Sequence, residues 1–445
     1  MSIGVNAESF SSPAERIRAV LDHLGVKCAH FASALAGEIE PWLSDGASRL
    51  ASLTLVNPNR LDVGRLATLD ARLALLGGTD GLPASVLDAA ASQLDAARIE
   101  RLDGYYAAAW SDVVAEHSGR IVDLLETQAR LWASDADATG PAKQTGAVAG
   151  VRFRVEGSGP PLVLLPLLLA PSQWEPIVER LSESFSVIVL RGRHLGMVAM
   201  LESRGAESGY RRAVRAVFDE LKPQPGESIL EVGCGTGVLT RYIGALTEGA
   251  NPIIGADLNE YFLSEARAIA EDDGLSDRLD FQVGNAEALA FEDNCFDVVF
   301  SSTVMEECDA EKMLDELIRV TRPGGRIGVI VRGTDMAGVI GLPLSDGLKQ
   351  KIETPYRSVG ENGCADATLY QRFADHGLTQ CEFFPHFLSL RDSLGAAWAY
   401  REPFFLSLFT PEVSAEWERA KRQANESGTF VFASGLHCAV GIKPA

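Results

Sequence analysis

The stretch Ile229-Leu-Glu-Val-Gly-Cys-Gly-Thr-Gly237 decides the fold of the C-terminal half of this 445-residue chain. Its apolar start, Ser228 to Val232, is typical of a short buried parallel strand. The three glycines predict a sharp turn that a ligand can approach closely, and a helical pattern resumes at Val238. Dinucleotide-binding turns need G-x-G-x-x-G, whereas the spacing here is E-x-G-x-G-x-G. Glu231 would repel a pyrophosphate and attract an amino-acid ammonium group.

The turn and the segments that follow it resemble, in order, the class I S-adenosylmethionine-dependent methyltransferases. The matching segments lie at residues 252–259, 284–287, 291–299, 301–307 and 322–325. The resemblance covers residues 205–445 and implies a Rossmann-like sheet whose last strand, near residues 430–441, is antiparallel. It also implies S-adenosyl-L-methionine as the cofactor. The segment pattern is closest to quinone- and sterol-type methyltransferases, which act on carbon, oxygen or nitrogen of apolar metabolites.

The resemblance also assigns cofactor-binding residues. Asp257 would accept hydrogen bonds from both ribose hydroxyls, which suits an anionic acceptor with two oxygens. The family usually has Asp at position 285, and Asn285 offers the adenine amino group one carbonyl acceptor instead. The complete expected set is Glu231, Gly233, Cys234, Gly235, Gly237, Asp257, Leu258, Asn285, Ala286 and Ser301.

Methyl transfer from a sulfonium needs an aligned acceptor lone pair, and it needs a general base only if the attacking atom carries a proton. Family members often have a Glu-His pair where this chain has Glu306-Glu307. One of these carboxylates could have a raised pKa if it is buried; alternatively, the pair caps a helix or is solvated. His386 is the preferred base, so the expected catalytic residues are His386, Glu307 and Glu306.

An acceptor-binding insertion is expected at residues 335–430, which are rich in aromatic side chains. Such a density favours an apolar or aromatic acceptor pocket or a cation cage, although each ring taken singly is more typical of core packing. Arg401 would hold an acidic acceptor. The expected substrate-binding residues are Met305, Tyr356, Tyr400 and Arg401. His437 and Cys438 are adjacent on a strand and point to opposite faces, so they cannot bind a metal together.

The N-terminal half alternates strand and helix patterns, which indicates a second α/β layer with a parallel sheet. Strands are expected at residues 29–32, 53–58, 71–76, 97–102, 151–155, 162–166 and 185–190. Residues 134–149 are small and polar, contain Gly140-Pro141, and predict a linker or long loop.

These pieces resemble the α/β-hydrolase family in an unexpected order. Residues 15–130 look like the C-terminal half of that fold, and residues 148–196 look like its N-terminal half. The resemblance implies a circular permutation, which closely placed termini can tolerate. Two unrelated fragments, or two protomers that complete each other, are the alternatives.

The hydrolase-like half lacks the residues that hydrolysis needs. A G-x-S-x-G elbow would place Leu35 at the nucleophile position and Ser33 at the first glycine. Asp80 occupies the acid position, but only tyrosines such as Tyr106 lie near the expected histidine. Pro166 stands where the oxyanion loop needs a donor, and proline has no N–H. We therefore expect a catalytically silent module.

Composition bounds the partners and the compartment. A formal net charge of −21 disfavours nucleic acid as a substrate. We see no secretory signal and no apolar run long enough to span a membrane. Seven scattered cysteines suit a reducing compartment and argue against a metal site. A cytoplasmic protein is expected, with a tail at residues 1–14, domains at 15–200 and 205–445, and a possible homodimer.

Together these observations predict a methyltransferase acting on a small, apolar or aromatic metabolite, with a silent hydrolase-like domain for dimerisation or substrate cover. One alternative is an S-adenosylmethionine-binding protein that catalyses another reaction. Another is an interaction protein that works through its hydrolase-like half.

Overall fold

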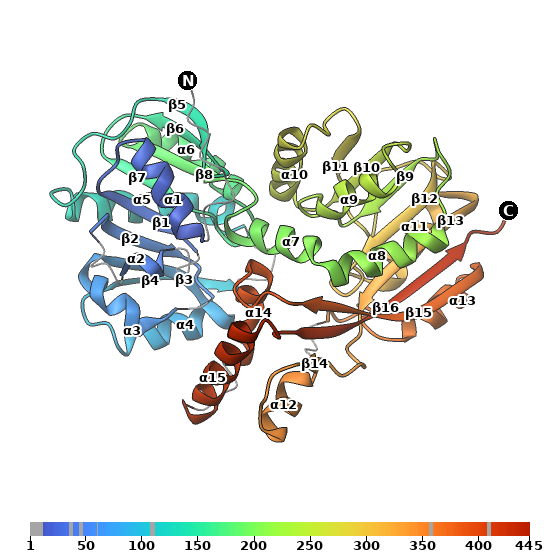
Figure 1. The fold of residues 1–445 in the computed structure, drawn as a ribbon. Coiled ribbons are helices and arrows are strands. Elements are labelled where there is room, and N and C mark those ends of the chain that lie inside the picture. The colour runs from blue at the N-terminus through green and yellow to red at the C-terminus, as the bar shows by residue number, and fades with distance from the viewer. Residues whose placement is uncertain are drawn as a thin grey trace. The chain divides into compact units, whose positions relative to one another are not determined.

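The chain divides into two compact units, residues 1–199 and 200–445. The computed structural model describes residues 12–34, 39–43, 48–59, 61–106, 112–355, 359–406 and 411–445 (Figure 1). Each unit contains one eight-stranded sheet with helices along it. Both sheets are mostly parallel with antiparallel strands at one side, which confirms the predicted α/β class.

The N-terminal sheet has the strand order β4-β3-β2-β1-β7-β8-β6-β5. Its strands are β1 (Ala29–Ser33), β2 (Leu50–Val56), β3 (Leu73–Asp80), β4 (Arg98–Tyr106), β5 (Gln144–Val148), β6 (Val151–Gly157), β7 (Pro161–Leu164) and β8 (Ser186–Arg191). Its helices are α1 (Pro13–His23), α2 (Glu40–Leu43), α3 (Val63–Leu66), η3 (Ala67–Arg72), α4 (Gly81–Ala91), α5 (Val113–Leu131), η4 (Pro171–Trp174) and α6 (Glu175–Ser182). Every residue of β1 and β2 is buried, as expected for central parallel strands covered on both faces.

The N-terminal sheet joins two segments of its unit that lie far apart in sequence. β1 to β4 form one side, β5 to β8 form the other, and the two sides meet where β1 pairs in parallel with β7. β6 runs antiparallel to both β8 and β5. One chain therefore completes this sheet by itself.

β5 lies inside the segment expected to be a linker. It forms a hairpin with β6 in which Val148 faces Val151, and Ala149 and Gly150 turn the chain with φ of 54° and 74°. Two consecutive positive φ values are the geometry of a two-residue type I′ hairpin turn. The small, polar composition of this segment did not predict the strand, because the residue pair Ala-Gly is a weaker signal for a hairpin turn than Asn-Gly.

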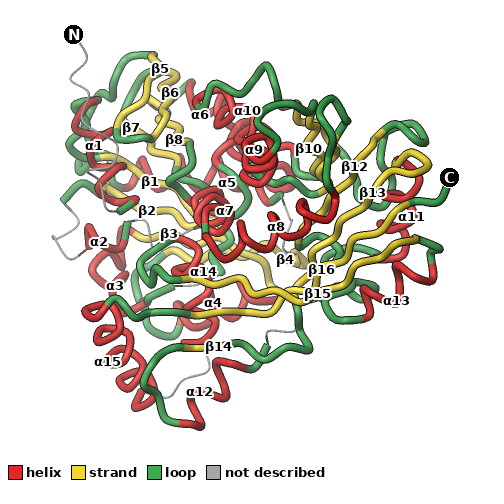
Figure 2. The backbone as a smooth tube through the Cα atoms, turned by 45° about the vertical axis from the view of Figure 1, so that its right-hand side comes forward, coloured by secondary structure: helices red, strands yellow, loops and turns green. Residues whose placement is uncertain are grey.

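The C-terminal sheet has the order β11-β10-β9-β12-β13-β16, with β14 and β15 also paired to β16. Its strands are β9 (Ile229–Val232), β10 (Ile253–Asp257), β11 (Leu279–Val283), β12 (Phe296–Ser302), β13 (Thr321–Arg332), β14 (Val339–Ile340), β15 (Thr379–Leu390) and β16 (Phe432–Ile442). β9 to β13 are parallel and β16 is antiparallel to β13, as the resemblance implied. Figure 2 shows β15 and β16 side by side.

The remaining helices are α7 (Gly196–Ala206), α8 (Ser208–Leu221), α9 (Val238–Leu246), α10 (Glu260–Asp272), α11 (Ala310–Val320), α12 (Asp346–Glu353), α13 (Thr368–Asp375), α14 (Ala396–Leu406) and α15 (Pro411–Ser427). α8 buries Tyr210, Val214, Val217 and Leu221, an apolar stripe at helical spacing. Helix α8 packs closely on β13, as shown by Gly328, where an added Cβ would lie 2.7 Å from Val217. Across the described residues, no helix combines the length and the apolar character that a membrane span requires.

The strand order reverses between β9 and β12. In open α/β sheets, ligands bind outside the carboxyl ends of the strands at such a switch point. The glycine turn follows β9 directly, so the topology places the turn where a ligand is expected.

Candidate cofactor and acceptor site

The three glycines of the turn after β9 all have left-handed backbones, with φ of 77° at Gly233, 52° at Gly235 and 70° at Gly237. Side chains at two of these positions would collide with their neighbours. A Cβ would lie 2.0 Å from Val304 at Gly233 and 2.5 Å from Phe281 at Gly237. Gly235 is the least crowded, since its nearest neighbour would be Leu201 at 3.5 Å. The turn therefore packs on β11 and on the end of β12, while its middle glycine leaves room for a ligand.

Asp257, the last residue of β10, ties this turn to the neighbouring strand. One carboxylate oxygen accepts from the Gly235 amide at 2.7 Å and the other from the Asn259 amide at 2.8 Å. Burial raises the pKa of Asp257, while these two backbone hydrogen bonds lower it. Each oxygen keeps a further lone pair, so the geometry can accept two hydroxyl groups from a ligand as well.

Glu231 lies within β9 and is 2% exposed. Its carboxyl group accepts a hydrogen bond from the Thr240 hydroxyl at 2.5 Å. Burial raises the pKa of Glu231 to about 8. The free protein therefore holds this group largely protonated at neutral pH, and a nearby ammonium group would favour the carboxylate form.

The residues expected at the adenine lie on the next loops of the same edge. Leu258 is 66% exposed and offers an apolar surface. The side-chain carbonyl of Asn285 accepts from the Glu287 amide at 2.9 Å, and Ala286 lies beside it in the same turn. Ser301 is buried and donates to the Val232 carbonyl at 2.8 Å, so it fastens β12 to β9.

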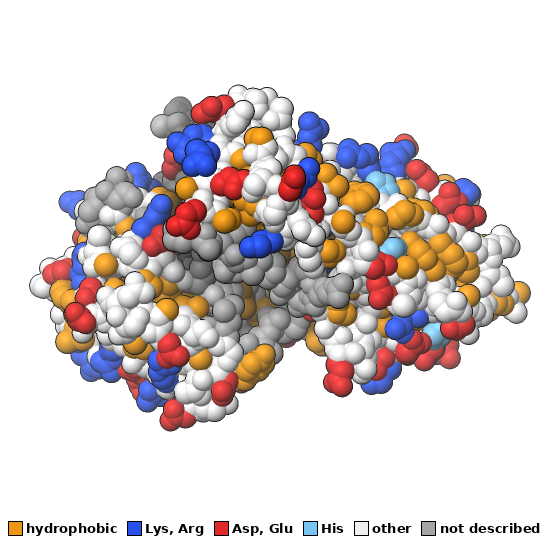
Figure 3. Space-filling model, turned by 90° about the horizontal axis from the view of Figure 1, so that it is seen from below, with side chains coloured by type: hydrophobic (Ala, Val, Ile, Leu, Met, Phe, Trp, Pro, Cys, Tyr) orange, Lys and Arg blue, Asp and Glu red, His pale blue; other side chains and the backbone are white. Residues whose placement is uncertain are grey.

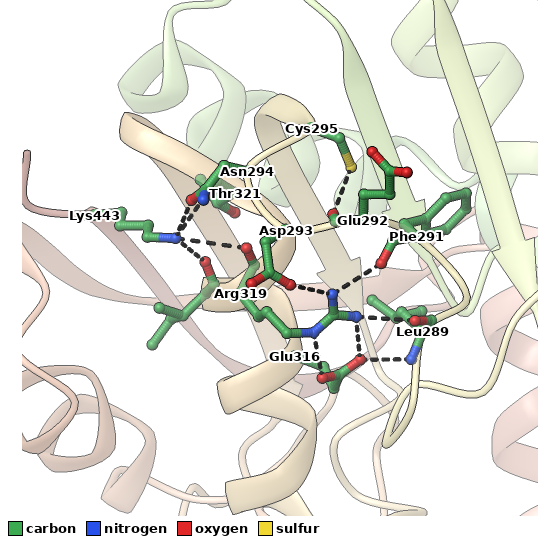
Figure 4. Close-up of polar contacts among 11 residues, drawn as sticks. Leu289, Phe291, Glu292, Asp293, Asn294, Cys295, Glu316, Arg319, Thr321 and Lys443 are labelled. Carbon is green, nitrogen blue, oxygen red and sulfur yellow. Dashed lines mark hydrogen bonds and ion pairs between the residues drawn. The ribbon is translucent and has the colours of Figure 1, made fainter.

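Arg319 on α11 pins the loop that follows this turn (Figure 4). Its guanidinium donates to both carboxylate oxygens of Glu316, to Asp293 and to the carbonyls of Phe291 and Leu289, at 2.7–2.9 Å. These five bonds use all five N–H donors of the side chain. The hydrogen bonds from Glu316 and Asp293 hold the pKa of Arg319 above its usual range.

We expect Arg319→Ala to lower the free energy of unfolding by about 2–3 kcal/mol, because it removes the donor to the Phe291 and Leu289 carbonyls and leaves Glu316 with the Leu289 amide as its donor. Arg319→Lys should recover little, since an ammonium cannot reproduce the planar fork. Arg322→Ala is the matched control, because Arg322 makes one exposed ion pair, with Asp297 at 2.5 Å, and should cost less than about 1 kcal/mol. Urea unfolding measures all three. Equal losses for Arg319→Ala and Arg322→Ala would contradict the pinning role.

Helix α7 supplies contacts to the turn that the sequence did not predict. Glu202 accepts from the Thr236 hydroxyl at 2.6 Å and pairs with Arg241 at 2.5 Å. Leu201 approaches Gly235 from the same helix. These residues fall between the two expected domains and lie more than thirty positions from their partners, so no local motif marks them.

The end of β12 has an unusual backbone. Thr303 has a φ of 56°, a left-handed conformation that is rare for a β-branched residue. Tyr210 on α8 bonds through its hydroxyl to Ser302 at 2.6 Å and to Thr303 at 3.4 Å. The next residue, Val304, packs against Gly233. Strain of this kind often accompanies a functional site, and here it lies beside the glycine turn.

Glu306 and Glu307 have different environments. Glu306 is fully buried, and one of its oxygens accepts from the Arg332 amide at 2.6 Å. Its other oxygen, Oε2, has no hydrogen-bond partner in the part of the chain that the structure describes. Burial raises the pKa of Glu306. Glu307 is 39% exposed and forms an ion pair with Arg332 at 2.7 Å. Glu306 is therefore the buried carboxyl group of the pair, and Glu307 is the solvated one.

His386 lies on β15, away from the glycine turn. Its ring accepts from the Phe387 amide at 3.0 Å, and it faces Leu436 on β16. β15 is four strand steps from β9, or about 19 Å at the usual strand spacing. The sheet does not bring His386 together with the turn.

Two phenylalanines on the same strand, Phe383 and Phe387, are 39% and 40% exposed. Hydrophobic side chains gather on the side where Figure 1 places β15 and α13 (Figure 3).

A histidine with no predicted role forms a partly buried chain of hydrogen bonds. His437 on β16 bonds to the Tyr370 hydroxyl and to Asp335, both at 2.7 Å. Burial raises the pKa of Tyr370 to about 12. A cavity of about 590 Å³ lies beside Asp335 and is lined mostly by residues of α12 and the segments before and after it. The three residues are 35 to 102 positions apart, which is why their spacing in the sequence did not reveal the chain of hydrogen bonds.

The residues expected at the acceptor do not form one group. Met305 is fully buried in the core, and Tyr400 is 58% exposed. Arg401 on α14 lies over the ring of Phe432 at 4.9 Å. Tyr356 lies outside the described residues.

Cys234, one of the expected cofactor-binding residues, is buried, which raises the pKa of its thiol well above the usual value.

A parallel sheet with a glycine turn at its switch point and an acidic residue ending the next strand defines a Rossmann-like nucleoside-binding unit. Residues 230–329 match the family model described as a methyltransferase domain. The C-terminal unit therefore contains a methyltransferase domain, and the curated relatives that the chain matches include C-methyltransferases.

Three curated relatives illustrate the similarity. The chain is 29% identical over 184 residues to the ubiquinone/menaquinone biosynthesis C-methyltransferase UbiE of Hahella chejuensis, covering 38% of this chain and 74% of that protein. It is 33% identical to the methyltransferase GfsG of Streptomyces halstedii, covering 29% and 47%. It is 39% identical to the sterol 24-C-methyltransferase ERG6B of Gibberella zeae, covering 24% and 28%. The chain thus spans less than half of the last two.

Solved structures are similar at lower sequence identity. A geranyl diphosphate methyltransferase in complex with S-adenosylmethionine is 18% identical, with a TM-score of 0.32 over 53% of this chain and 91% of that one. The YcgJ protein of Bacillus is 18% identical, with a TM-score of 0.36 over 53% and 99%.

Proposed function

We propose that the protein transfers the methyl group of S-adenosylmethionine to a small, apolar or aromatic molecule. The observation that carries this proposal is the contact between Asp257 and Gly235, which joins a ribose acceptor to the glycine turn at the switch point of the sheet. When bound, the cofactor supplies an electrophilic methyl group on a sulfonium. The relatives named above as C-methyltransferases support carbon as the acceptor atom.

The residues would divide the work as follows. Asp257 binds the ribose hydroxyls, and the buried Glu231 meets the ammonium group of the methionine part. Leu258, Asn285 and Ala286 hold the adenine. Exclusion of water around the end of β12 would let alignment of the acceptor supply much of the rate.

An acceptor carbon or phenol must also lose a proton. Among the expected bases, Glu306 fits best, because it is buried beyond the end of β12, its pKa is raised and its Oε2 has no partner in the described part of the chain. His386 fits less well, since four strand steps separate its strand from β9.

Incubation with S-adenosylmethionine carrying a labelled methyl group, in the presence of cell extract, tests the proposal. We expect label in a small organic-soluble product that mass spectrometry can identify, and no label with Asp257→Ala. Wild-type protein that binds S-adenosylmethionine in calorimetry but leaves every label on the cofactor would indicate a different reaction. Absence of binding would overturn the proposal.

For the N-terminal unit we propose a permuted hydrolase-like module without hydrolytic activity. Its support is that β1 and β7, which the resemblance assigns to opposite halves of the hydrolase fold, pair in one sheet. Ser33 is fully buried and donates to the Pro166 carbonyl at 3.3 Å, and Tyr106 is 64% exposed on β4. Leu35 lies outside the described residues. Hydrolysis of p-nitrophenyl acetate above the rate of heat-inactivated protein would contradict this.

A further inference from the structure

The charges of two arginines, Arg204 and Arg332, act on a third, Arg401, and the three come from separate elements of the C-terminal unit. Arg204 lies in the last turn of α7, Arg332 ends β13, and Arg401 lies in α14. α14 contacts α7, because the Ala397 amide donates to the Ser203 hydroxyl at 3.4 Å. Burial lowers the pKa of Arg401 to about 10, and the positive charges of Arg204 and Arg332 contribute to this shift. Like charges in a partly buried place are unfavourable unless something of opposite charge lies there.

Within the described ranges, Arg332 alone of the three has carboxylate partners. Arg332 pairs with Glu307 at 2.7 Å and with Glu306 at 3.4 Å. Arg204 lies over the ring of Tyr210 at 5.4 Å and contacts the Thr303 hydroxyl at 3.4 Å. The buried Nε of Arg204 has no hydrogen-bond partner in the described ranges.

Among the described residues, the Arg401 guanidinium contacts an aromatic ring. Its guanidinium lies over Phe432, and no ion pair or hydrogen bond joins it to another described residue. The adjacent acid, Glu402, is occupied elsewhere: it accepts from Trp417 at 2.8 Å and from Lys421 at 2.5 Å. Two guanidiniums beside aromatic rings therefore have no anionic partner in the part of the chain that the structure describes.

We propose that Arg401, together with Arg204, binds an anionic oxygen group of the methyl acceptor, such as a carboxylate or a phosphate. This proposal rests on the proposed methyltransferase function and makes the acceptor an apolar or aromatic molecule with one acidic group. A guanidinium fork matches two oxygens of such a group. The neighbouring rings of Phe432 and Tyr210 would contact the apolar part of the same molecule.

The site adjoins the cofactor turn without being part of it. Arg204 contacts Thr303, and the next residue, Val304, packs against Gly233. Arg401 instead lies over β16, three strand steps from β9, or about 14 Å at the usual strand spacing. The cofactor also carries a carboxylate, but this separation assigns Arg401 to the acceptor.

Benzoate and its neutral counterpart benzamide are suitable probes, with binding followed by ligand-observed NMR on protein saturated with S-adenosylhomocysteine. We expect wild-type protein to bind benzoate at least tenfold more tightly than benzamide. Arg401→Met should remove that preference and leave S-adenosylhomocysteine affinity within twofold. Arg419→Met, an exposed arginine on α15, controls for the change of net charge and should leave both affinities unchanged.

Three outcomes would overturn the proposal. They are equal binding of benzoate and benzamide by wild-type protein, retention of the preference in Arg401→Met, and displacement of benzoate by S-adenosylhomocysteine with weaker binding of both in Arg401→Met. The last outcome would place the cofactor's own carboxylate at Arg401. If Arg401→Met does not fold, Arg401→Lys replaces it, and an unchanged preference there would exclude the forked contact. Failure to bind S-adenosylmethionine tests the function separately, because benzoate binding can also be measured without a nucleoside.

Discussion

Asp257→Ala is expected to weaken S-adenosylmethionine binding by about 100-fold or more. Two charge-assisted hydrogen bonds to the ribose would be lost, each worth about 1.5–3 kcal/mol, and every 1.4 kcal/mol corresponds to a factor of ten. The Gly235 amide would also lose the acceptor that holds the turn to β10. Isothermal titration calorimetry measures the change directly.

Two further variants make this result specific. Asp257→Asn keeps one carbonyl acceptor and should fall between the wild type and Asp257→Ala. Asp277→Ala removes an exposed carboxylate of the same unit and should leave the affinity unchanged. Wild-type affinity in Asp257→Ala would remove Asp257 from the cofactor site.

Gly233→Ala is expected to lower the free energy of unfolding by about 2–5 kcal/mol. A left-handed backbone costs a non-glycine residue about 1–2 kcal/mol, and overpacking adds about 1–3 kcal/mol. The second contribution arises because the new Cβ would lie 2.0 Å from Val304. Thermal and urea unfolding of the purified protein would measure the loss.

Gly226→Ala separates the two contributions. Gly226 also has a positive φ, 89°, but a Cβ there would meet nothing within 4 Å. It should therefore show only the backbone cost, and Gly233→Ala combined with Val304→Ala should approach the same value. Equal destabilisation by the two single glycine variants would show that Val304 does not constrain the turn.

The sequence predicted the C-terminal fold well because the deciding signals are local. A strand, a glycine turn and a helix start within nine residues, and an acid such as Asp257 ending the next strand, require no knowledge of distant contacts. Strand β5 was missed because its local sequence contains no such signal. The turn after it, Ala149-Gly150, is defined by its backbone angles, which the composition does not reveal.

The acceptor side was harder to predict because its contacts join distant parts of the chain. Thr236 meets Glu202 across 34 positions, and Thr303 meets Arg204 across 99. Met305 follows an apolar strand end and could equally have lined a pocket, but the fold turns it into the core. The sequence predicts that Arg401 holds an acidic acceptor, whereas the structure adds that the charges of Arg204 and Arg332 act on it.

The buried Glu231 also makes the free site a reservoir for one proton. Its folded pKa of about 8 lies above the ordinary value of 4.5, so the stability that the protonated form contributes is complete below pH 4.5 and is lost as the pH rises through 8. A ligand that brings an ammonium group to Glu231 would expel the proton, and its affinity should rise between pH 6 and 8. Calorimetry in buffers of different ionisation enthalpy would count the released proton, and Glu231→Gln should abolish the release. Occupancy of the site would then follow the acidity of its surroundings as well as the supply of cofactor.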